Sequence, residues 1–335
     1  MSTSEVTQSR GEVSAVVAAA KAGDESAFAS LAERYRGELQ VHCYRMLGSF
    51  EDSEDLVQDT FLRAWRARAS YEGRSSFRAW MYRIATNACL DAIDRRPPSM
   101  QIAEGPEVAW LQPYPDRLLD GIASSEAEPD AAIVAKETIE LAYLAAIQHL
   151  PPRQRAVLIV RDVLGWSAKD AAALLETTVA SVNSAVQRAR AGLKKHLPER
   201  RLEWAPGLDP SEEERALLRR YVDATERADA DAFAEMMRAD ASFAMPPEPG
   251  RWVGRDAIVA GWKEGGFGTA DFRDLRCLLT RANKQPAVAC YLRRPGESEH
   301  TAFALDVLRI DEGAIGEIVT FPAGLFPAFD LPSKL

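Results

Sequence analysis

Residues 53–95 constrain the fold more than any other stretch of this chain, because they carry two long helical patterns separated by a short break. The first pattern places apolar or small side chains on one helical stripe, at Leu56, Val57, Thr60, Phe61, Ala64 and Trp65. The second pattern repeats this arrangement at Phe77, Trp80, Met81, Ile84, Ala88 and Ile93. Asp52 or Ser53 is expected to cap the first helix. The stretch therefore predicts a helical hairpin with one buried side on each helix.

The break between these helices, residues 66–77, has the sequence RARASYEGRSSF. Its arginines suit phosphate groups, its tyrosine suits stacking on an unpaired base, and Gly73 lets the backbone approach a ligand closely. Two interpretations stay open from these residues alone. The loop is either a solvated connection with Trp65 and Trp80 in the core, or a surface that binds single-stranded nucleic acid.

The hairpin belongs to a larger all-helical module that we expect over residues 24–96. Asp24 can cap an earlier helix, and Gly48 is suited to end it. The proline pair at 97–98 closes the module. Residues 1–23 are expected to be a polar tail, without the apolar segment of a secretory signal. The chain has no run of about 18 apolar residues, so no membrane span is expected.

Residues 97–130 are expected to form an acidic, proline-rich linker. They contain six prolines, and residues 101–150 carry two basic and nine acidic side chains, a net charge of −7. A segment of this composition is usually a solvated spacer. Trp110 and Tyr114 do not fit that description, because large aromatic rings in a linker imply docking. Their expected partner is another domain or a groove on a partner protein.

A helix-turn-helix is predicted within residues 131–200. One helix is expected to end at Gly165, Ser167 can cap a short second helix, and a turn at Glu176 leads to a third. The third helix is expected to bury Val179, Val182, Val186, Ala189 and Leu193. Two short helices joined by a tight turn, with a free outer face on the second, are typical of this motif. The lack of a glycine at Glu176 counts slightly against it.

The outer face of the third helix has the chemistry of a surface that reads base pairs. Asparagine, glutamine and arginine can contact adenine and guanine edges, whereas lysine suits phosphate. The candidate residues are Asn183, Ser184, Gln187, Arg188, Arg190 and Lys194. Residues 151–200 hold nine basic and four acidic side chains, a local charge of +5 in a chain of net charge −9. The alternative is an ordinary amphipathic helix with a solvated polar face.

Residues 206–335 form a third part with a different texture. Ser211 can cap a helix, a second helix is expected near 231–237, and the rest has the pattern of short strands separated by turn residues. Helices followed by a curved antiparallel sheet indicate an α+β domain. The alternation from His300 to Leu308 places Asp306 among apolar neighbours on one face of a strand.

The two helical modules resemble those of the extracytoplasmic-function (ECF) sigma factors of bacterial RNA polymerase. Three long motifs carry the resemblance, in order: DSEDLVQDTFLRAW, FRAWMYRIATNACLDAIDRR and LPPRQRAVLIVRDVLGWSAKDAAALLETTVASVNSAVQRARAGL. They match regions 2 and 4 of that family. The resemblance implies two all-α modules, region 2 over residues 24–96 and region 4 over residues 131–200. It also implies a cytoplasmic protein that recognises and opens promoters with the polymerase core.

The resemblance further implies roles for individual residues. Region 2 would bind the β′ clamp helices of the polymerase through Asp55, Leu56, Val57 and Gln58. It would capture the opened −10 element with Tyr71, Arg74, Ser75, Ser76, Phe77 and Trp80. Region 4 would contact the β flap and read the −35 element with Asn183, Ser184, Gln187 and Arg188, and Arg190 and Lys194 extend that face. The linker would thread the polymerase cleft.

The C-terminal part resembles the cone-shaped SnoaL-like domains, which share the fold of nuclear transport factor two. The motifs MPPEPGRWVGRDAI and ALDVLRIDEGAIGEIVTF carry this resemblance. Enzymes of this fold use a pocket carboxylate as a base, and the candidate pocket residues here are Tyr221, Met245, Trp252 and Asp306. A buried aspartate can equally be a structural acceptor. We expect no catalytic residue, cofactor or metal, and a regulatory domain that contacts the sigma modules.

Two other functions stay open at this point. One is a one-component transcription regulator that responds to a ligand and uses the helix-turn-helix alone. The other is a SnoaL-like enzyme tethered to DNA. The first of these leaves residues 53–95 without a role, which favours the sigma factor.

Overall fold

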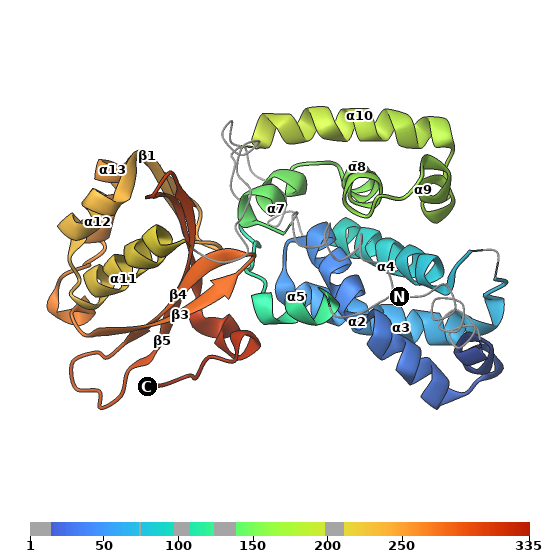
Figure 1. Cartoon of the computed structure of the whole chain (residues 1–335), viewed down its shortest axis with the longest axis horizontal. Helices are drawn as coiled ribbons and strands as arrows, with labels where there is room; N and C mark the ends of the chain where they lie inside the picture. The colour runs from blue at the N-terminus through green and yellow to red at the C-terminus, as the bar shows by residue number, and fades with distance from the viewer. Residues whose placement is uncertain (1–14, 74, 97–107, 124–138, 198–210) are drawn as a thin grey trace. The chain divides into compact units, whose positions relative to one another are not determined.

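A computed structural model describes residues 15–73, 75–96, 108–123, 139–197 and 211–335 (Figure 1). The chain divides into two compact units. The first comprises residues 1–99, 118–138 and 146–196, and the second comprises 100–117, 139–145 and 197–335. Two of the boundaries between these segments fall inside short helices, α5 (Asp116–Ala123) and α7 (Leu141–Gln148). Within the described ranges, no helix is both long and apolar enough to cross a bilayer.

The N-terminal helices of the first unit are α2 (Glu25–Leu47), α3 (Phe50–Ala67) and α4 (Phe77–Asp94). Asp24 caps α2, and Gly48 ends it in the left-handed conformation with φ of 73°, as the sequence predicts. The predicted cap of α3 is wrong. Ser49 caps this helix, and Ser53 lies buried inside it with its hydroxyl donating to the Phe50 carbonyl at 2.6 Å. The chain therefore turns from α2 into α3 within two residues.

The helix-turn-helix consists of α8 (Pro152–Leu158), which continues as the π-helical turn η3 (Ile159–Val163), then α9 (Ala168–Leu174) and α10 (Val179–His196). Ser167 caps α9 by accepting from the Asp170 N–H at 3.1 Å. Val182, Val186 and Ala189 are buried, as expected. Val179 begins the first turn of α10 and is 44% exposed, and Leu193 is only half-buried, so these two predictions are wrong.

The turn before α10 holds a strained residue, which supplies a first testable prediction. Glu176 has φ of 52°, a left-handed conformation that costs a residue with a Cβ roughly 1–2 kcal/mol. Glu176→Gly is expected to raise the free energy of unfolding by about 1 kcal/mol, measured by denaturant titration. Glu176→Ala is the control, because it removes the carboxylate 3.9 Å from Arg83 without relieving the strain. Equal effects of the two changes would contradict the explanation.

The second unit is built on a six-stranded sheet in the order β2-β1-β6-β5-β4-β3. The strands are β1 (Met237–Ala244), β2 (Arg251–Val253), β3 (Leu275–Ala282), β4 (Gln285–Leu292), β5 (Thr301–Asp311) and β6 (Ala314–Pro322). The α+β class is as predicted, but the sheet is mixed, because β1 pairs with β6 in parallel. The short strand β2 was not predicted.

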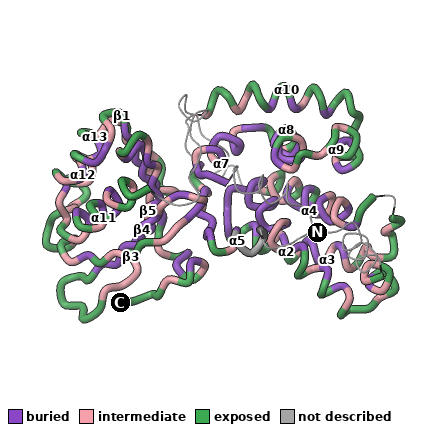
Figure 2. Tube along the Cα trace, viewed as in Figure 1, coloured by how far each residue is buried: buried purple, intermediate pink, exposed green. Residues whose placement is uncertain are grey.

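Three helices pack with the sheet around one core: α11 (Glu212–Glu226), α12 (Ala230–Met236) and α13 (Arg255–Glu264) (Figures 1 and 2). Ser211 and Glu214 form the capping box of α11. α13 was not predicted. The largest core side chains come from all layers: Leu217, Tyr221, Phe233, Phe243, Ile258, Leu308 and Ile318.

The strand β5 does not keep a single alternating face. Its register with β4 shifts between Ala302 and Ala304, which leaves Phe303 as an extra, 38% exposed residue. Because a bulge reverses the alternation, the predicted face from His300 to Leu308 is interrupted. His300 instead precedes the strand, and its Nε2 lies 2.8 Å from Asp274.

Candidate functional site

The predicted polymerase-binding residues lie on α3 but do not share one face. Asp55 and Gln58 are exposed, and Leu56 is half-buried. Val57 is 1% exposed, so its side chain belongs to the core of the module. Leu62 is 55% exposed and follows Gln58 by four residues, on the same side of the helix. Leu62 was not predicted as a site residue, although a large apolar side chain on an otherwise polar helical face was a detectable signal.

The aromatic residues after α3 form one cluster. The ring of Tyr71 lies 5.6 Å from Phe77 and 5.3 Å from Trp80, measured between ring centroids. Phe77 and Trp80 are 5.4 Å apart, and both are at least nine-tenths buried. Tyr71 is therefore the accessible ring of the cluster, and it packs against the buried rings of Phe77 and Trp80.

Hydrogen bonds fix the loop that carries Tyr71. Its hydroxyl donates to the Ser75 carbonyl at 2.7 Å, and partial burial raises the pKa of Tyr71. Ser76 caps α4 by accepting from the Ala79 N–H at 3.1 Å. Ser75 and Ser76 are both exposed. Arg74, the remaining predicted member of this site, lies outside the described residues.

An arginine and a tryptophan just before this loop form a cation–π pair. The Arg68 guanidinium lies 4.0 Å from the centre of the Trp65 ring, and its Nη1 donates to the Trp65 carbonyl at 2.7 Å. Such a cation–π pair holds a positive charge at a fixed place. Arg68 was not predicted as a site residue, although an arginine three residues after a helical tryptophan was a signal for this pair.

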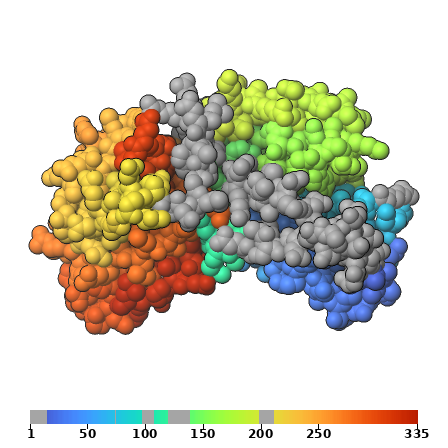
Figure 3. All heavy atoms as spheres, in the orientation of Figure 1, coloured from blue at the N-terminus to red at the C-terminus, as the bar shows by residue number. Residues whose placement is uncertain are grey.

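The predicted base-reading residues all lie on the exposed side of α10, whose tube is mostly exposed in Figure 2 and whose side chains form an uncovered surface in Figure 3. Asn183, Ser184, Gln187 and Arg188 occupy consecutive turns of this side. Lys194 lies in the last turn, where its charge also suits the negative end of the helix. A continuous polar and basic face of this kind can enter the major groove.

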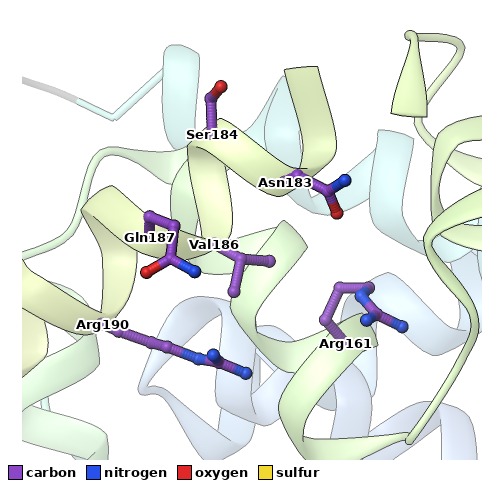
Figure 4. A pocket seen from close by; sticks show the side chains of 6 residues that line it. All are labelled: Arg161, Asn183, Ser184, Val186, Gln187 and Arg190. Carbon is purple, nitrogen blue, oxygen red and sulfur yellow. The ribbon is translucent and has the colours of Figure 1, made fainter. Parts of the chain in front are cut away.

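A hollow of about 310 Å³ lies beside this face (Figure 4). It is lined by Arg161, Asn183, Ser184, Val186, Gln187 and Arg190. Arg190 is held there by Asp162, which accepts from its Nε and Nη2 at 2.8 Å each. These hydrogen bonds to Asp162 raise the pKa of Arg190. Arg161 and Asp162 were not predicted as site residues, since only the fold brings η3 next to α10.

The buried guanidinium of Arg155 connects the helix-turn-helix to the N-terminal helices. It is 3% exposed and donates to the carbonyl of Met46 in α2. It also donates to the side-chain and backbone oxygens of Gln148, at 2.5 and 2.6 Å. The Gln148 amide in turn donates to the Arg45 carbonyl at 3.0 Å. Burial lowers the pKa of Arg155 to about 9, so the group stays protonated at neutral pH.

The linker aromatic Tyr114 is docked on the C-terminal domain, within the second unit. Its backbone N–H donates to Asn283 Oδ1 at 2.7 Å, and its carbonyl accepts from the Asn283 N–H at 2.9 Å. Asn283 Nδ2 also donates to the Ile139 carbonyl at 2.6 Å. Asp116 accepts from the Lys284 N–H at 2.7 Å and pairs with Arg281 at 3.2 Å. Of the two partners that the sequence left open for the linker aromatics, the structure places Tyr114 on a domain of the same chain.

Three apolar side chains of the linker itself are buried. Val108, Leu111 and Tyr114 are 3%, 6% and 0% exposed. The contact lies at the turn between β3 and β4, where Asn283 and Lys284 both have positive φ, at 57° and 60°. Two consecutive left-handed residues make the type I′ turn of a tight hairpin. The segment Val108–Arg117, which we call the docked linker, therefore behaves as part of this domain.

Asp306, one of the four predicted pocket residues, accepts hydrogen bonds on both carboxylate oxygens. Tyr221 donates its hydroxyl to Asp306 Oδ2 at 2.9 Å, and Thr320 donates to Oδ1 at 2.6 Å. Burial raises the pKa of Asp306, against the hydrogen bonds from Thr320 and Tyr221, which lower it. Met245 and Trp252 pack against the same core. The ring centroid of Trp252 lies 5.5 Å from that of Phe243. Of the four predicted residues, Tyr221 and Asp306 are joined by a hydrogen bond, whereas Met245 and Trp252 make apolar contacts.

Comparisons with known proteins agree with this arrangement. Residues 31–97 match the family model of Sigma-70 region 2, residues 140–193 match Sigma-70 region 4, and residues 218–318 match the SnoaL-like domain. The chain is 39% identical to the ECF RNA polymerase sigma factor SigG of Mycobacterium tuberculosis, over 92% of this chain and 85% of SigG. It is 31% identical to SigW of Bacillus subtilis, over 53% of this chain and 92% of SigW.

A solved structure supports the fold of the whole chain. The crystal structure of the M. tuberculosis ECF sigma factor SigJ aligns with a TM-score of 0.60 and 19% sequence identity. The alignment covers 91% of this chain and 99% of SigJ. The likeness to SigG extends through all three parts of the chain, whereas a one-component regulator would need only the helix-turn-helix. The chain belongs to the ECF sigma factors, the subunits that bind RNA polymerase core and direct it to promoters, and it carries a C-terminal SnoaL-like domain.

Proposed function

We propose that the exposed face of α10 reads the −35 element, that the loop around Tyr71 holds the opened −10 strand, and that α3 binds the polymerase clamp. The observation that carries this proposal is the unbroken polar and basic face of α10. Tyr71 offers a ring for stacking, with Phe77 and Trp80 as its support. Because the Val57 side chain is buried in the core of the module, we assign the contact with polymerase to the exposed residues near it on α3.

The −35 assignment separates two kinds of residue, and each predicts a different result. Arg188→Ala is expected to weaken binding of the holoenzyme to its own −35 sequence by about 1–3 kcal/mol, because arginine reads guanine edges. Lys194→Ala is expected to weaken binding to all sequences alike and to reduce the salt slope by about 1. Affinity measured over a set of −35 variants at several salt concentrations checks both. A uniform loss in Arg188→Ala would remove the base-reading role.

The clamp assignment depends on the exposed apolar side chain of Leu62. Leu62→Asp is expected to weaken binding to polymerase core at least about 10-fold, because it places a charge in the centre of an apolar contact. Leu279 offers a matched control, since it is also 55% exposed but lies on β3 of the C-terminal domain. Leu279→Asp should bind core normally in the same titration. Equal binding by both variants would remove Leu62 from the interface.

We also propose that the SnoaL-like domain regulates the sigma factor by holding the docked linker. In this proposal the linker is needed along the polymerase cleft, so docking on the hairpin of β3 and β4 withholds it. The bonds from Asn283 to Tyr114 and Ile139 support the proposal. Truncation is a poor test, because cutting at residue 205 would expose Leu111 and Tyr114. A point change in the hairpin is the better probe.

The SnoaL-like domain is proposed to act without catalysis. Asp306 receives hydrogen bonds on both oxygens from Tyr221 and Thr320, which suits a structural acceptor. A general base would need a free lone pair aimed at a substrate. Because its partner is bacterial RNA polymerase, we place the protein in the cytoplasm.

A further inference from the structure

Two cysteines face each other across the strands β3 and β4. Cys277 and Cys290 are direct partners in the antiparallel register, and their sulfur atoms are 3.8 Å apart. The Arg293 N–H donates to the Asp274 carbonyl at 3.0 Å, which makes that position a hydrogen-bonded pair. Because the two kinds of pair alternate, Cys277 and Cys290 form a non-hydrogen-bonded pair.

This position suits a disulfide. Opposed Cα atoms in a non-hydrogen-bonded pair are about 4.5 Å apart, within the range of roughly 4.4–6.8 Å that disulfides span. The Cys277 N–H confirms the geometry, because it points away from β4 and donates to Glu226 Oε1 at 3.0 Å. No movement of the strands is required to bring the sulfurs together beyond a rotation of the side chains.

The two thiols differ in how easily an oxidant in solution can reach them. Cys277 is partly exposed, whereas Cys290 is buried. The thiol of Cys290 donates a hydrogen bond to Asp306 Oδ2 at 3.7 Å inside the domain. The other two cysteines, Cys43 and Cys89, are 0% exposed in the core of the N-terminal helices. An oxidant in solution therefore reaches Cys277 first.

We propose that Cys277 and Cys290 are a redox-active pair that a hydroperoxide converts to a disulfide. The Cys277 thiolate attacks one peroxide oxygen, the O–O bond breaks, the departing alkoxide or hydroxide takes a proton from solvent and leaves as alcohol or water, and a sulfenic acid forms on Cys277. The Cys290 sulfur then attacks the Cys277 sulfur and displaces the hydroxyl group, which takes the proton of the Cys290 thiol and leaves as water. Two thiols lose two electrons, and the peroxide gains them.

Peptide mapping of the full-length chain tests the proposal. The protein is treated with hydrogen peroxide at pH 8, alkylated under denaturing conditions and digested with trypsin. The expected product joins residues 277–281 (CLLTR) to residues 285–293 (QPAVACYLR), with a loss of two hydrogens relative to the separate peptides. The peptides 37–45 and 84–95, which hold Cys43 and Cys89, should stay alkylated. Dithiothreitol should remove the cross-link.

Two variants assign the parts. In Cys290→Ser, Cys277 should be trapped as a sulfenic acid that dimedone labels, because the second sulfur is missing. In Cys277→Ser, Cys290 should remain a free thiol at the same peroxide dose, because it is buried, and it should then be alkylated in full. The proposal is overturned if the wild-type peptides remain separate, or if the cross-link joins Cys43 or Cys89 instead. It is also overturned if Cys290 oxidises as fast in Cys277→Ser as the pair does in the wild type.

Discussion

Asn283→Gly is expected to release the docked linker and to raise transcription from the promoters of this sigma factor. The change removes the side-chain bonds to the Tyr114 N–H and the Ile139 carbonyl, at 2.7 and 2.6 Å, and leaves two buried backbone groups unsatisfied. The loss is about 3 kcal/mol of docking energy, which corresponds to an undocked population on the order of 100-fold larger. Glycine suits the φ of 57° at this position, so the turn itself is preserved.

Limited proteolysis and run-off transcription measure the two parts of this expectation. Trypsin cleavage after Arg117 should accelerate, because docking ties its guanidinium to the Ala328 carbonyl at 2.7 Å. Asn283→Asp is a second probe: it keeps an acceptor for the Tyr114 N–H but places a buried carboxylate oxygen against the Ile139 carbonyl. It should therefore also accelerate cleavage and raise transcription. Faster cleavage without a change in transcription would separate docking from regulation and refute the regulatory proposal.

Local signals in the sequence predicted the ends of several helices correctly, although α5 and α13 were not predicted. Asp24, Ser167 and Ser211 cap helices where expected, and Gly48 ends one, because each acts on backbone groups within a few residues. The cap of α3 failed for the same reason. Ser49 and Ser53 both satisfy the local rule, and the choice depends on where α2 ends. The parallel pairing of β1 with β6 escaped prediction entirely, because the two strands are far apart in the sequence.

The candidate sites divide in a similar way. The exposed face of α10 follows from helical periodicity alone, so Asn183 and Gln187 were placed correctly on its outer side. The pairing of Arg190 with Asp162 and the burial of Arg155 depend on tertiary packing, which periodicity does not report. The linker is an intermediate case. Its aromatic residues indicated docking, but the partner Asn283 lies 169 residues away from Tyr114.

Acid is expected to destabilise the N-terminal helices through His42. Burial, together with the smaller effect of the charges of Arg45 and Arg78, lowers the pKa of His42 to about 3. Its Nε2 lies 2.9 Å from the Thr86 hydroxyl, and its side chain is 0% exposed. The unfolded chain takes up a proton at this residue near pH 6.5, whereas the folded chain does so only near pH 3. Stability is therefore lost as the pH falls through this interval, by up to about 1.4 kcal/mol per pH unit.

His42→Gln isolates this contribution, because glutamine stays uncharged at every pH in this range and can still form a hydrogen bond with Thr86. The difference in unfolding free energy between wild type and variant should change by about 2 kcal/mol between pH 7 and pH 5, as wild type loses stability that the variant keeps. Carboxylates elsewhere titrate equally in both proteins, so they cancel in this difference. Urea titrations at intervals of half a pH unit provide the measurement. If the unfolding free energies of the two proteins changed in parallel with pH, the folded chain would accommodate a charged His42. That would require a carboxylate or water beside the ring. It would also require looser packing of α2 against α4 than the distance of 5.0 Å between the ring centroids of His42 and Tyr82 allows.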